Sequence, residues 1–442
     1  MNNSLTRWDH TKNKRIQNAL RLAVERQEIA GALVLVRRGE DELCYLEEGL
    51  ADIEKASPMR RDTIFRCYSM SKPVTSAAAM LLLQDGLIEP MEPLSRYFPE
   101  YTNMQVVTKD GVAPAQRPVL IRDLLNMTSG ISYPGCSNEA EAGSARVYWD
   151  FCKRLGSDSM GTTEEFARRM GGCPLSFEPG TSWQYGASAD VLGAVIEKVA
   201  GMSFGEFLRR RLFDPLGMKD TGFSVPDAKL PRLAKVYAAG AAAPADAGEA
   251  DTQAENAEKN TPSDSAAGSA AADQPANGSA IAGSGKGLRG LSLYTGCNLA
   301  IRNDGGANPF ESGGAGLHST IDDYMAFARM LMRGGRSAAG EQILSPGIIR
   351  YMTDHSLSAA QQAAFDTWDG LEGFTYGNFL RVMKDPSRAA TPSRRGEYGW
   401  DGWLGTYFGN FPDEDMTFLM MMQTTDYGTG ILTRRLRSIL LG

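Results

Sequence analysis

The chain has 442 residues, of which 42% are hydrophobic and 22% are charged, as in an ordinary globular protein with a large core. The formal net charge is −7 without a large basic block, which argues against nucleic acid as a partner, because phosphate binding depends on clustered lysine and arginine. No apolar run approaches the roughly 18 residues of a membrane-spanning helix, so no membrane span is expected.

Residues 1–27 contain neither the apolar core of a signal peptide nor a small-residue cleavage site, so we expect a cytoplasmic protein. The cysteines form no C-x-x-C pair, and we expect them to be reduced and mostly buried rather than joined in a disulfide framework. The three histidines are not spaced as metal ligands and H-E-x-x-H is absent from the sequence, so no metal site is predicted.

The chain opens with a helix and two strands. Apolar residues such as Ile16 and Leu20 recur at helical spacing within residues 9–28. Two strand-like runs follow at residues 31–39 and 42–52, separated by the turn-prone sequence "GED". From about residue 81 to residue 223 the pattern is mainly helical, with glycine and proline breaks.

Residues 238–287 differ from the rest of the chain in composition. Small and polar residues make up this segment, and its only large apolar residue is Ile281. Such a segment cannot bury enough surface to offset its ordering entropy, which predicts a disordered insertion. Beyond it, a glycine-rich turn leads into an amphipathic helix for which Ser319 or Thr320 is the expected N-cap, and the chain ends with strands joined by "PDED" and a final helix.

This order of elements predicts an α+β fold. Both chain ends are expected to join one antiparallel sheet flanked by the N- and C-terminal helices, with a helical subdomain beside it. The predicted units are an α/β sheet subdomain (residues 1–75 and 288–442), a mainly helical subdomain (76–237) and the insertion (238–287). A site would then form in the cleft between the two subdomains.

One short motif in this frame suggests nucleophilic chemistry. Ser69 stands three residues before Lys72, and if a helix begins at Ser69 the two share a face, so that the amine reaches the hydroxyl. A serine hydroxyl is a weak nucleophile until a base takes its proton, and lysine is such a base only when burial or nearby positive charge lowers its pKa. A bare Ser-x-x-Lys is more often a helix cap beside an exposed lysine, so a catalytic interpretation needs support from the rest of the chain.

The stretch "DTIFRCYSMSKPVTSAAAMLLLQDGLIE" resembles the nucleophile motif of the serine β-lactamase and penicillin-binding protein superfamily, and more narrowly of its class C β-lactamase-like branch. The likeness spans most of the chain, including residues 121–131, 177–204, 215–223 and 312–331. It implies a β-lactamase/transpeptidase-like fold and acyl-enzyme chemistry. Carboxylesterases, D-amino-acid peptidases and transacylases belong to this branch.

By this resemblance, Tyr185 in "WQYGAS" matches the tyrosine of the second family motif. Its phenolate, or its hydroxyl relaying to Lys72, would be the general base on Ser69 and would later return the proton to the leaving group. Taken alone, a tyrosine here is more often a core aromatic. The family often has asparagine two residues later, where this chain has Ala187, and this departure weakens a β-lactamase interpretation.

The third family motif, usually Lys-Thr-Gly, is absent from the sequence. The matching place holds Trp400, Asp401 and Gly402, similar to the Trp-x-Gly variant of esterase and transacylase relatives, and these residues are expected to bind substrate. The resemblance implies an oxyanion hole formed by the backbone N–H groups of Ser69 and Trp403. Without the lysine, this motif has no fixed positive charge that could bind a substrate carboxylate.

The predicted function is that of a serine hydrolase, a carboxylesterase on small neutral esters, with catalytic residues Ser69, Lys72 and Tyr185 and no metal or organic cofactor. The expected partner is a small-molecule ester or amide, and the sequence leaves the oligomeric state open. A β-lactamase, D-amino peptidase or transacylase of the same superfamily is the first alternative, and a non-catalytic binding protein with this fold is the second. No G-x-S-x-G occurs for an α/β-hydrolase, and His318 is expected to be structural.

Overall fold

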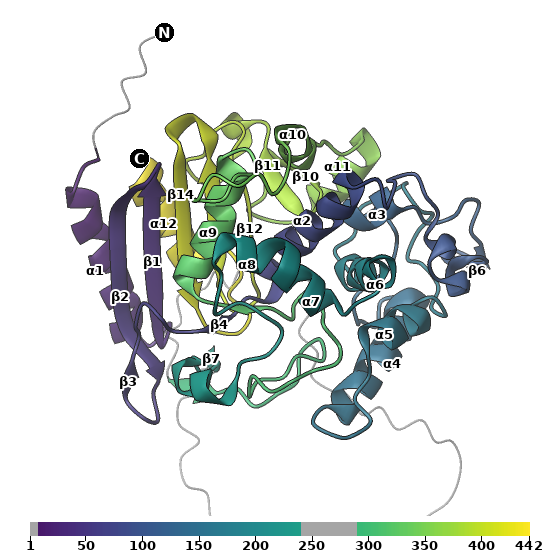
Figure 1. Ribbon diagram of the computed structural model, residues 1–442, viewed down its shortest axis with the longest axis horizontal. Coiled ribbons are helices and arrows are strands. Elements are labelled where there is room, and N and C mark those ends of the chain that lie inside the picture. Colours follow the sequence, from purple (N-terminus) through teal and green to yellow (C-terminus); the bar gives the residue numbers. More distant parts are fainter. Residues whose placement is uncertain (1–7, 240–289) are drawn as a thin grey trace, which may run out of the picture.

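One eight-stranded antiparallel sheet is built from the two ends of the chain (Figure 1). The computed structural model describes residues 8–239 and 290–442. The strand order is β10-β11-β12-β13-β14-β1-β2-β3, so N-terminal β1 pairs with C-terminal β14. The strands are β1 (Gly31–Arg38), β2 (Asp41–Asp52), β3 (Ser57–Pro58), β10 (Phe374–Gly377), β11 (Leu380–Met383), β12 (Tyr398–Asp401), β13 (Tyr407–Phe411) and β14 (Met416–Met422).

Both faces of this sheet are covered, which explains why its central strands are apolar throughout. Alternate residues of a strand point to opposite faces, and Val34 opposite Met420 faces one layer while Leu35 opposite Leu419 faces the other. The first face packs against helices α1 (Thr11–Glu25) and α12 (Ile431–Leu441). The second packs against the buried helix α2 (Ser71–Gln84) and against α9 (Ile321–Met332).

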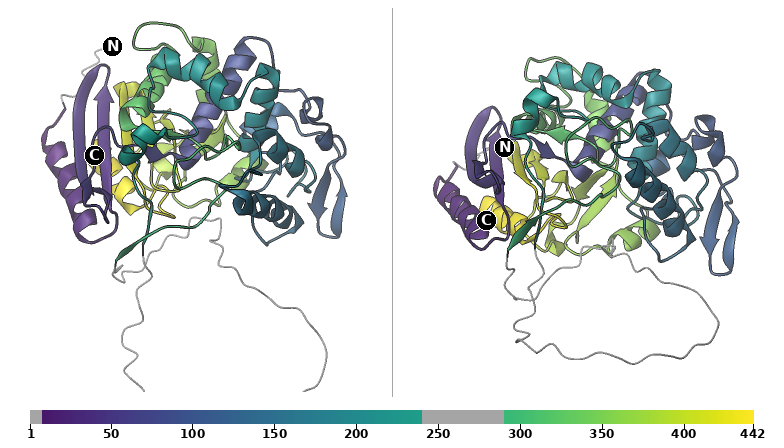
Figure 2. Two further views of the ribbon diagram at one scale, coloured as in Figure 1. Left: turned by 60° about the horizontal axis from the view of Figure 1, so that its bottom comes forward. Right: turned by 90° about the horizontal axis from the view of Figure 1, so that it is seen from below.

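The middle of the chain lies beside the sheet as a helical region. Figure 1 shows α3 to α6 on the side of the molecule away from α1, and both views of Figure 2 keep this separation. The remaining helices are α3 (Ile121–Leu125), α4 (Glu139–Arg154), α5 (Thr163–Met170), α6 (Ser188–Ala200), α7 (Phe204–Leu208), α8 (Asp214–Leu216), α10 (Pro346–Thr353) and α11 (Ala359–Phe365). The predicted α+β class with an antiparallel sheet is therefore confirmed.

The helical region also contains a hairpin that the mainly helical interpretation missed. Strands β5 (Gln105–Thr108) and β6 (Gly111–Pro114) pair around the turn of Lys109 and Asp110, with Thr108 opposite Gly111. Gly111 has φ +112°, a backbone conformation that favours glycine. Aspartate followed by glycine is a general turn signal, so the sequence did carry some of this information.

The predicted insertion lies almost entirely outside the described residues. Its first two residues are an exception, because Ala238 and Ala239 belong to β7 (Tyr237–Ala239). This strand pairs antiparallel with β8 (Leu291–Leu293), with Ala239 opposite Leu291. The prediction of disorder is therefore wrong for these two residues, since the backbone of β8 supplies their hydrogen-bond partners.

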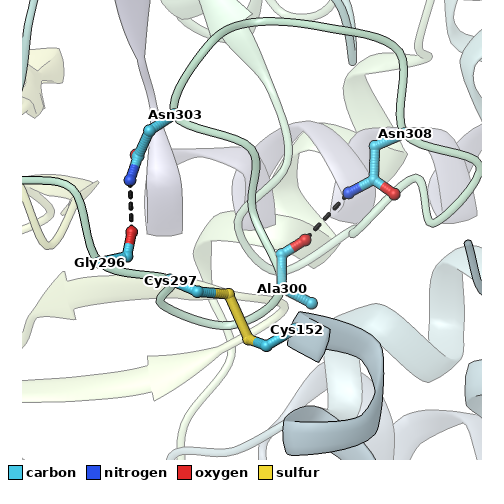
Figure 3. The surroundings of a disulfide bond; sticks show 6 residues. All are labelled: Cys152, Gly296, Cys297, Ala300, Asn303 and Asn308. Carbon is cyan, nitrogen blue, oxygen red and sulfur yellow. Dashed lines mark hydrogen bonds between the residues drawn. A yellow bond between two sulfur atoms is a disulfide. The ribbon is translucent and has the colours of Figure 1, made fainter. Parts of the chain in front are cut away.

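Two of the six cysteines form a disulfide, contrary to the prediction of six reduced thiols. Cys152 near the end of α4 is bonded to Cys297, 145 residues further along the chain (Figure 3). The loop around Cys297 is also held by its own side chains, since Asn303 Nδ2 donates to the Gly296 carbonyl at 2.6 Å. The bond forms because the fold brings two distant residues within disulfide reach, with a Cα–Cα distance of 6.2 Å.

Candidate active site

Ser69 lies in a tight turn between strand β4 (Phe65–Arg66) and helix α2. The turn is a 3₁₀ helix over Tyr68–Met70, and α2 begins at Ser71 rather than at Ser69. Tyr68 adopts a left-handed backbone with φ +44°, a conformation that costs about 1–3 kcal/mol and is frequent at active sites. Tyr68 and Met70 are buried, whereas Ser69 is partly exposed. The turn therefore leaves Ser69 accessible between two buried side chains.

Lys72 is completely buried in the first turn of α2, with its amine on the Ser69 hydroxyl. The Nζ atom donates to Ser69 Oγ at 3.0 Å, to Tyr133 OH at 2.9 Å and to the Gly314 carbonyl at 2.8 Å. All three acceptors are neutral. Burial lowers the pKa of Lys72 to about 7, against the raising effect of the Asp190 and Asp401 carboxylates. The amine therefore loses its proton readily near neutral pH, as a general base must.

Tyr185 precedes α6 and completes the predicted group. Its hydroxyl accepts a hydrogen bond from Trp400 Nε1 at 3.0 Å, and its ring centroid lies 4.5 Å from Lys72 Nζ. Burial raises the pKa of the phenol above its ordinary value, and hydrogen bonds with Ser69 and Trp400 offset only part of this effect. The phenol stays protonated at neutral pH, which favours a hydroxyl relay with Lys72 over a phenolate base.

Tyr133, in the loop between α3 and α4, belongs to the same group although the sequence analysis did not select it. Besides accepting from Lys72, its ring makes an edge contact with the Tyr185 ring at 5.7 Å between centroids. Burial holds the pKa of this phenol well above its ordinary value. The only local signal was its position two residues after the matched stretch at 121–131, because the contact with Lys72 spans 61 residues of chain.

The strand end with the predicted third motif lies directly against the serine turn. Gly402 follows β12, and a Cβ on this residue would come within 2.3 Å of the Cys67 carbonyl, so only glycine fits. The same carbonyl accepts from Thr406 Oγ1 at 3.0 Å. The Trp403 ring lies 5.0 Å from the Tyr68 ring, and Trp403 Nε1 donates to Asp426 Oδ1 at 2.6 Å. The strand end and the Ser69 turn are thus fixed to one another.

The other predicted substrate-binding residues have partners of their own. Trp400 is buried with its indole on Tyr185, whereas Asp401 Oδ1 accepts from Arg381 Nη1 at 2.6 Å. The carboxylate of Asp401 is therefore already held by an ion pair. Ala187, at the position of the family asparagine, is buried and offers no side-chain amide to a substrate.

Histidines and metal ligands do not contribute to this group of residues. His318 is buried in β9 (His318–Ser319), and burial lowers the pKa of its imidazole to about 3, so the ring is neutral. Across residues 8–239 and 290–442, no group of three or more histidine, cysteine, aspartate or glutamate side chains is arranged to hold a metal ion. Over the same residues, no helix combines the length and apolar character needed to cross a bilayer.

Comparison with known proteins identifies a family and similar solved structures. A family model described as Beta-lactamase matches residues 16–440. Protein Rv1367c of Mycobacterium tuberculosis is 29% identical over 410 residues, covering 89% of this chain and 86% of the relative. Esterase EstB of Burkholderia gladioli is 28% identical over 396 residues, covering 87% and 83%. The solved structure of EstCE1, a hydrolase with promiscuous acyltransferase activity, superposes with a TM-score of 0.73 at 26% identity, covering 98% of this chain and 99% of that one.

Proposed function

We propose that this chain, which belongs to the beta-lactamase family and is a serine hydrolase, is a carboxylesterase for small neutral esters with Ser69 as its nucleophile. The observation that carries the proposal is the 3.0 Å contact between Lys72 Nζ and Ser69 Oγ. The amine of that contact is buried among neutral acceptors and has a pKa of about 7. A lysine placed there only as a surface charge would be exposed.

In the acylation step, the neutral amine of Lys72 takes the proton of the Ser69 hydroxyl while Oγ attacks the ester carbonyl. The negative charge that develops on the carbonyl oxygen is stabilised by the backbone N–H groups of Ser69 and Trp403. When the carbon–oxygen bond to the alcohol breaks, the Tyr185 hydroxyl protonates the leaving oxygen and regains a proton from Lys72. The alcohol then leaves neutral, and the acyl group remains on Ser69.

In the deacylation step, a water molecule attacks the acyl-enzyme and gives its proton to the same pair, Lys72 and Tyr185. The bond between the acyl carbon and Ser69 Oγ breaks, Oγ regains its proton, and the carboxylic acid leaves. An alcohol in place of water would yield a new ester, so the same residues would support acyl transfer. The similarity to EstCE1, a hydrolase with promiscuous acyltransferase activity, favours this second candidate function.

Neutral substrates are favoured by the charges around the site. Where the usual family motif has a lysine, this chain has Trp400, whose indole is already bonded to Tyr185. Arg381 on the neighbouring strand β11 is buried and paired with Asp401, so its charge is balanced within the protein. A substrate carboxylate would find little compensation for its lost hydration here. We therefore infer that Trp400, Asp401 and Gly402 line the site of a neutral ester or amide.

A fluorophosphonate probe tests the nucleophile. The wild-type protein should be labelled on the peptide that contains Ser69, and Ser69→Ala should not be labelled. Ser71→Ala is the matched control, because Ser71 is a buried serine two residues away whose hydroxyl accepts from the Leu317 backbone N–H. Absence of labelling in the wild type would support the alternative of a non-catalytic binding protein.

Substrate panels test the esterase assignment against its closest rivals. Short p-nitrophenyl esters should be hydrolysed faster than the β-lactam nitrocefin or a D-amino-acid amide. The opposite order would identify a β-lactamase or D-amino peptidase and overturn the preference for esters. A panel of acyl chains and acceptor alcohols would then separate hydrolysis from acyl transfer.

The cellular compartment and the subdomain boundaries of this chain are also predicted. The sequence predicts a cytoplasmic protein, whereas the Cys152–Cys297 disulfide is of a kind that oxidising compartments favour. Fractionation combined with thiol alkylation before lysis would decide between these indications. The subdomains at residues 1–75 with 288–442 and at 76–237 are proposed folding units, and limited proteolysis would test their boundaries.

A further inference from the structure

Asp190 is a buried carboxylate in the first turn of α6 whose partners are neutral groups. Its Oδ1 accepts from the Gly314 backbone N–H at 3.1 Å and from the Ser312 hydroxyl. Its Oδ2 accepts from the Tyr148 hydroxyl at 3.2 Å. A buried carboxylate without an adjacent cation is costly, so its presence calls for a specific reason.

The Gly314 backbone connects this carboxylate to the catalytic amine. The N–H of Gly314 is held by Asp190, and its carbonyl accepts from Lys72 Nζ at 2.8 Å. There is no room for another residue type at this position, because a Cβ on Gly314 would lie 2.7 Å from Asp190 Oδ2 and 3.0 Å from Tyr133 OH. One residue therefore transmits the position of Asp190 to the amine.

A second connection runs through two tyrosines. Tyr148, from α4, donates to Asp190 and makes an edge contact with the Tyr133 ring at 6.1 Å between centroids. The Tyr133 hydroxyl is another acceptor of Lys72 Nζ. Two of the three acceptors of the amine are thus connected to Asp190. Gly314 is bonded to Asp190 directly, and Tyr133 contacts Tyr148, which is bonded to Asp190.

We propose that Asp190 is a positioning residue, which fixes the Lys72 amine on Ser69 through Gly314 and balances its positive charge across that one residue. This inference rests on the proposed function, because it assigns a role in the same proton transfer. Burial raises the pKa of Asp190 and lowers the pKa of Lys72, and the opposite charges of the two groups act against both effects, which supports the proposal.

Other ionisable groups also face this pair, and each comes from a different element. Lys72 is faced by Tyr133 and Tyr185 from loops and, through its charge, by Asp401 of β12. Asp190 is faced by Tyr148 of α4. Burial raises the pKa of all three tyrosines, which stay neutral near pH 7. Asp190 and Asp401 are therefore the anions whose removal alters the protonation of the amine.

The test is the pH profile of kcat/KM for a p-nitrophenyl ester with Asp190→Asn. Loss of the negative charge makes Lys72 a weaker base, so the acid limb should move down by about one pH unit. Asparagine keeps one neutral acceptor oxygen for Gly314 but places an NH2 group against the Tyr148 hydroxyl, so Gly314 should be held less firmly and kcat should fall about 10- to 100-fold, with KM within about threefold. An acid limb that stays in place, with only kcat or the melting temperature lowered, would overturn the proposal and leave Asp190 a structural residue of α6.

Two further variants separate the charge of Asp190 from its hydrogen bonds. Tyr148→Phe removes one donor but keeps the charge, so its acid limb should remain within about 0.3 pH unit of the wild type while kcat falls. If Asp190→Asn does not accumulate as folded protein, the double variant Ser312→Ala/Tyr148→Phe should still lower kcat, and wild-type kcat there would overturn the proposal. A wild-type protein that the fluorophosphonate does not label would instead contradict the proposed function itself.

Discussion

Two buried cations on opposite faces of the same sheet have different surroundings. Lys72, on the α2 side, donates to three neutral oxygens. Arg437, on α12, is 3% exposed and is paired with Glu397, with further hydrogen bonds to Tyr407 OH at 2.5 Å and Ser393 Oγ at 2.9 Å. Burial lowers the pKa of Lys72 to about 7, whereas the carboxylate and phenol partners keep the pKa of Arg437 above its ordinary value.

Burial can therefore either preserve or release a proton, depending on the partners of the buried group. A guanidinium with a carboxylate partner keeps its charge under all ordinary conditions and joins α12 to the sheet. An amine among neutral acceptors keeps its position without a fixed charge, so it can accept a proton from a nearby reacting group. Replacing residues around each cation should therefore affect activity on one face of the sheet and stability on the other.

The largest expected effect is on turnover at Lys72. Lys72→Met keeps a long side chain in the space but removes the base, so ester turnover should fall about 10³- to 10⁴-fold. The free energy of unfolding should change by less than about 2 kcal/mol, because relief from burying the amine offsets the lost hydrogen bonds. Steady-state kinetics and urea unfolding measure the two quantities, and a variant with wild-type turnover would remove Lys72 from the mechanism.

The reverse pattern is expected at the ion pair. Glu397→Gln leaves the Arg437 charge buried without its carboxylate, which should lower the free energy of unfolding by about 3–5 kcal/mol. Turnover of the folded protein should stay at the wild-type level, because Glu397 lies on the other face of the sheet from Lys72. A large loss of turnover with unchanged stability would contradict the division of roles between the two cations.

Tyr185→Phe alters the aromatic neighbour of the Lys72 amine. Removal of the hydroxyl proposed to return the proton to the leaving group should lower ester turnover at least about 100-fold. Tyr407→Phe is the matched control, because it removes a buried hydroxyl bonded to Arg437 instead. Near-full activity of Tyr185→Phe would remove this residue from the proposed relay.

The protonation of Lys72 should be visible in the wild-type pH profile. Raising the pH through about 7 removes the proton from the amine and creates the base, so kcat/KM should increase with pH across this range. At pH 6 it should be about one tenth of its plateau value, as for a single group that must lose its proton. A profile that is flat from pH 6 to pH 8 would show that the free amine is not required.

The smallest effect is expected from one acceptor of the amine. Tyr133→Phe removes one of three oxygens that bind Lys72 Nζ, and turnover should fall about three- to tenfold because the amine is less well positioned. The acid limb of kcat/KM should also move to lower pH, since the charged amine loses a hydrogen bond. No change in either quantity would show that the remaining acceptors suffice.

The sequence predicted those parts of the site that lie in continuous motifs. Ser69 and Lys72 are three residues apart, and the fold indeed brings them into hydrogen-bond contact. Tyr185 and Trp400 were selected from motifs that resemble a family pattern, and the structure joins them through one hydrogen bond. Their roles in catalysis remain predictions that the variants above test.

Other contacts were not predictable because they join residues that are far apart in the chain. The acceptor Gly314 lies 242 residues after Lys72. The sequence of a glycine-rich turn does not indicate which of its carbonyl groups will accept a hydrogen bond from an amine. The Cys152–Cys297 bond likewise depends on a distance that only the folded chain defines. The β5–β6 hairpin is different, because the turn-prone pair Asp110–Gly111 marks the end of its turn in the sequence and could have been used to predict it.

The pairing of β7 with β8 has a consequence for how this chain can be redesigned. Because Ala239 stands opposite Leu291, the path between the two strands has to span only the width of a hairpin. A turn of about two to five residues would be enough, and each doubling of a longer connection costs only about 0.6 kcal/mol in closure entropy. The fold thus offers a position for circular permutation or for insertion of a reporter domain, with the Cys152–Cys297 bond anchoring the returning chain nearby.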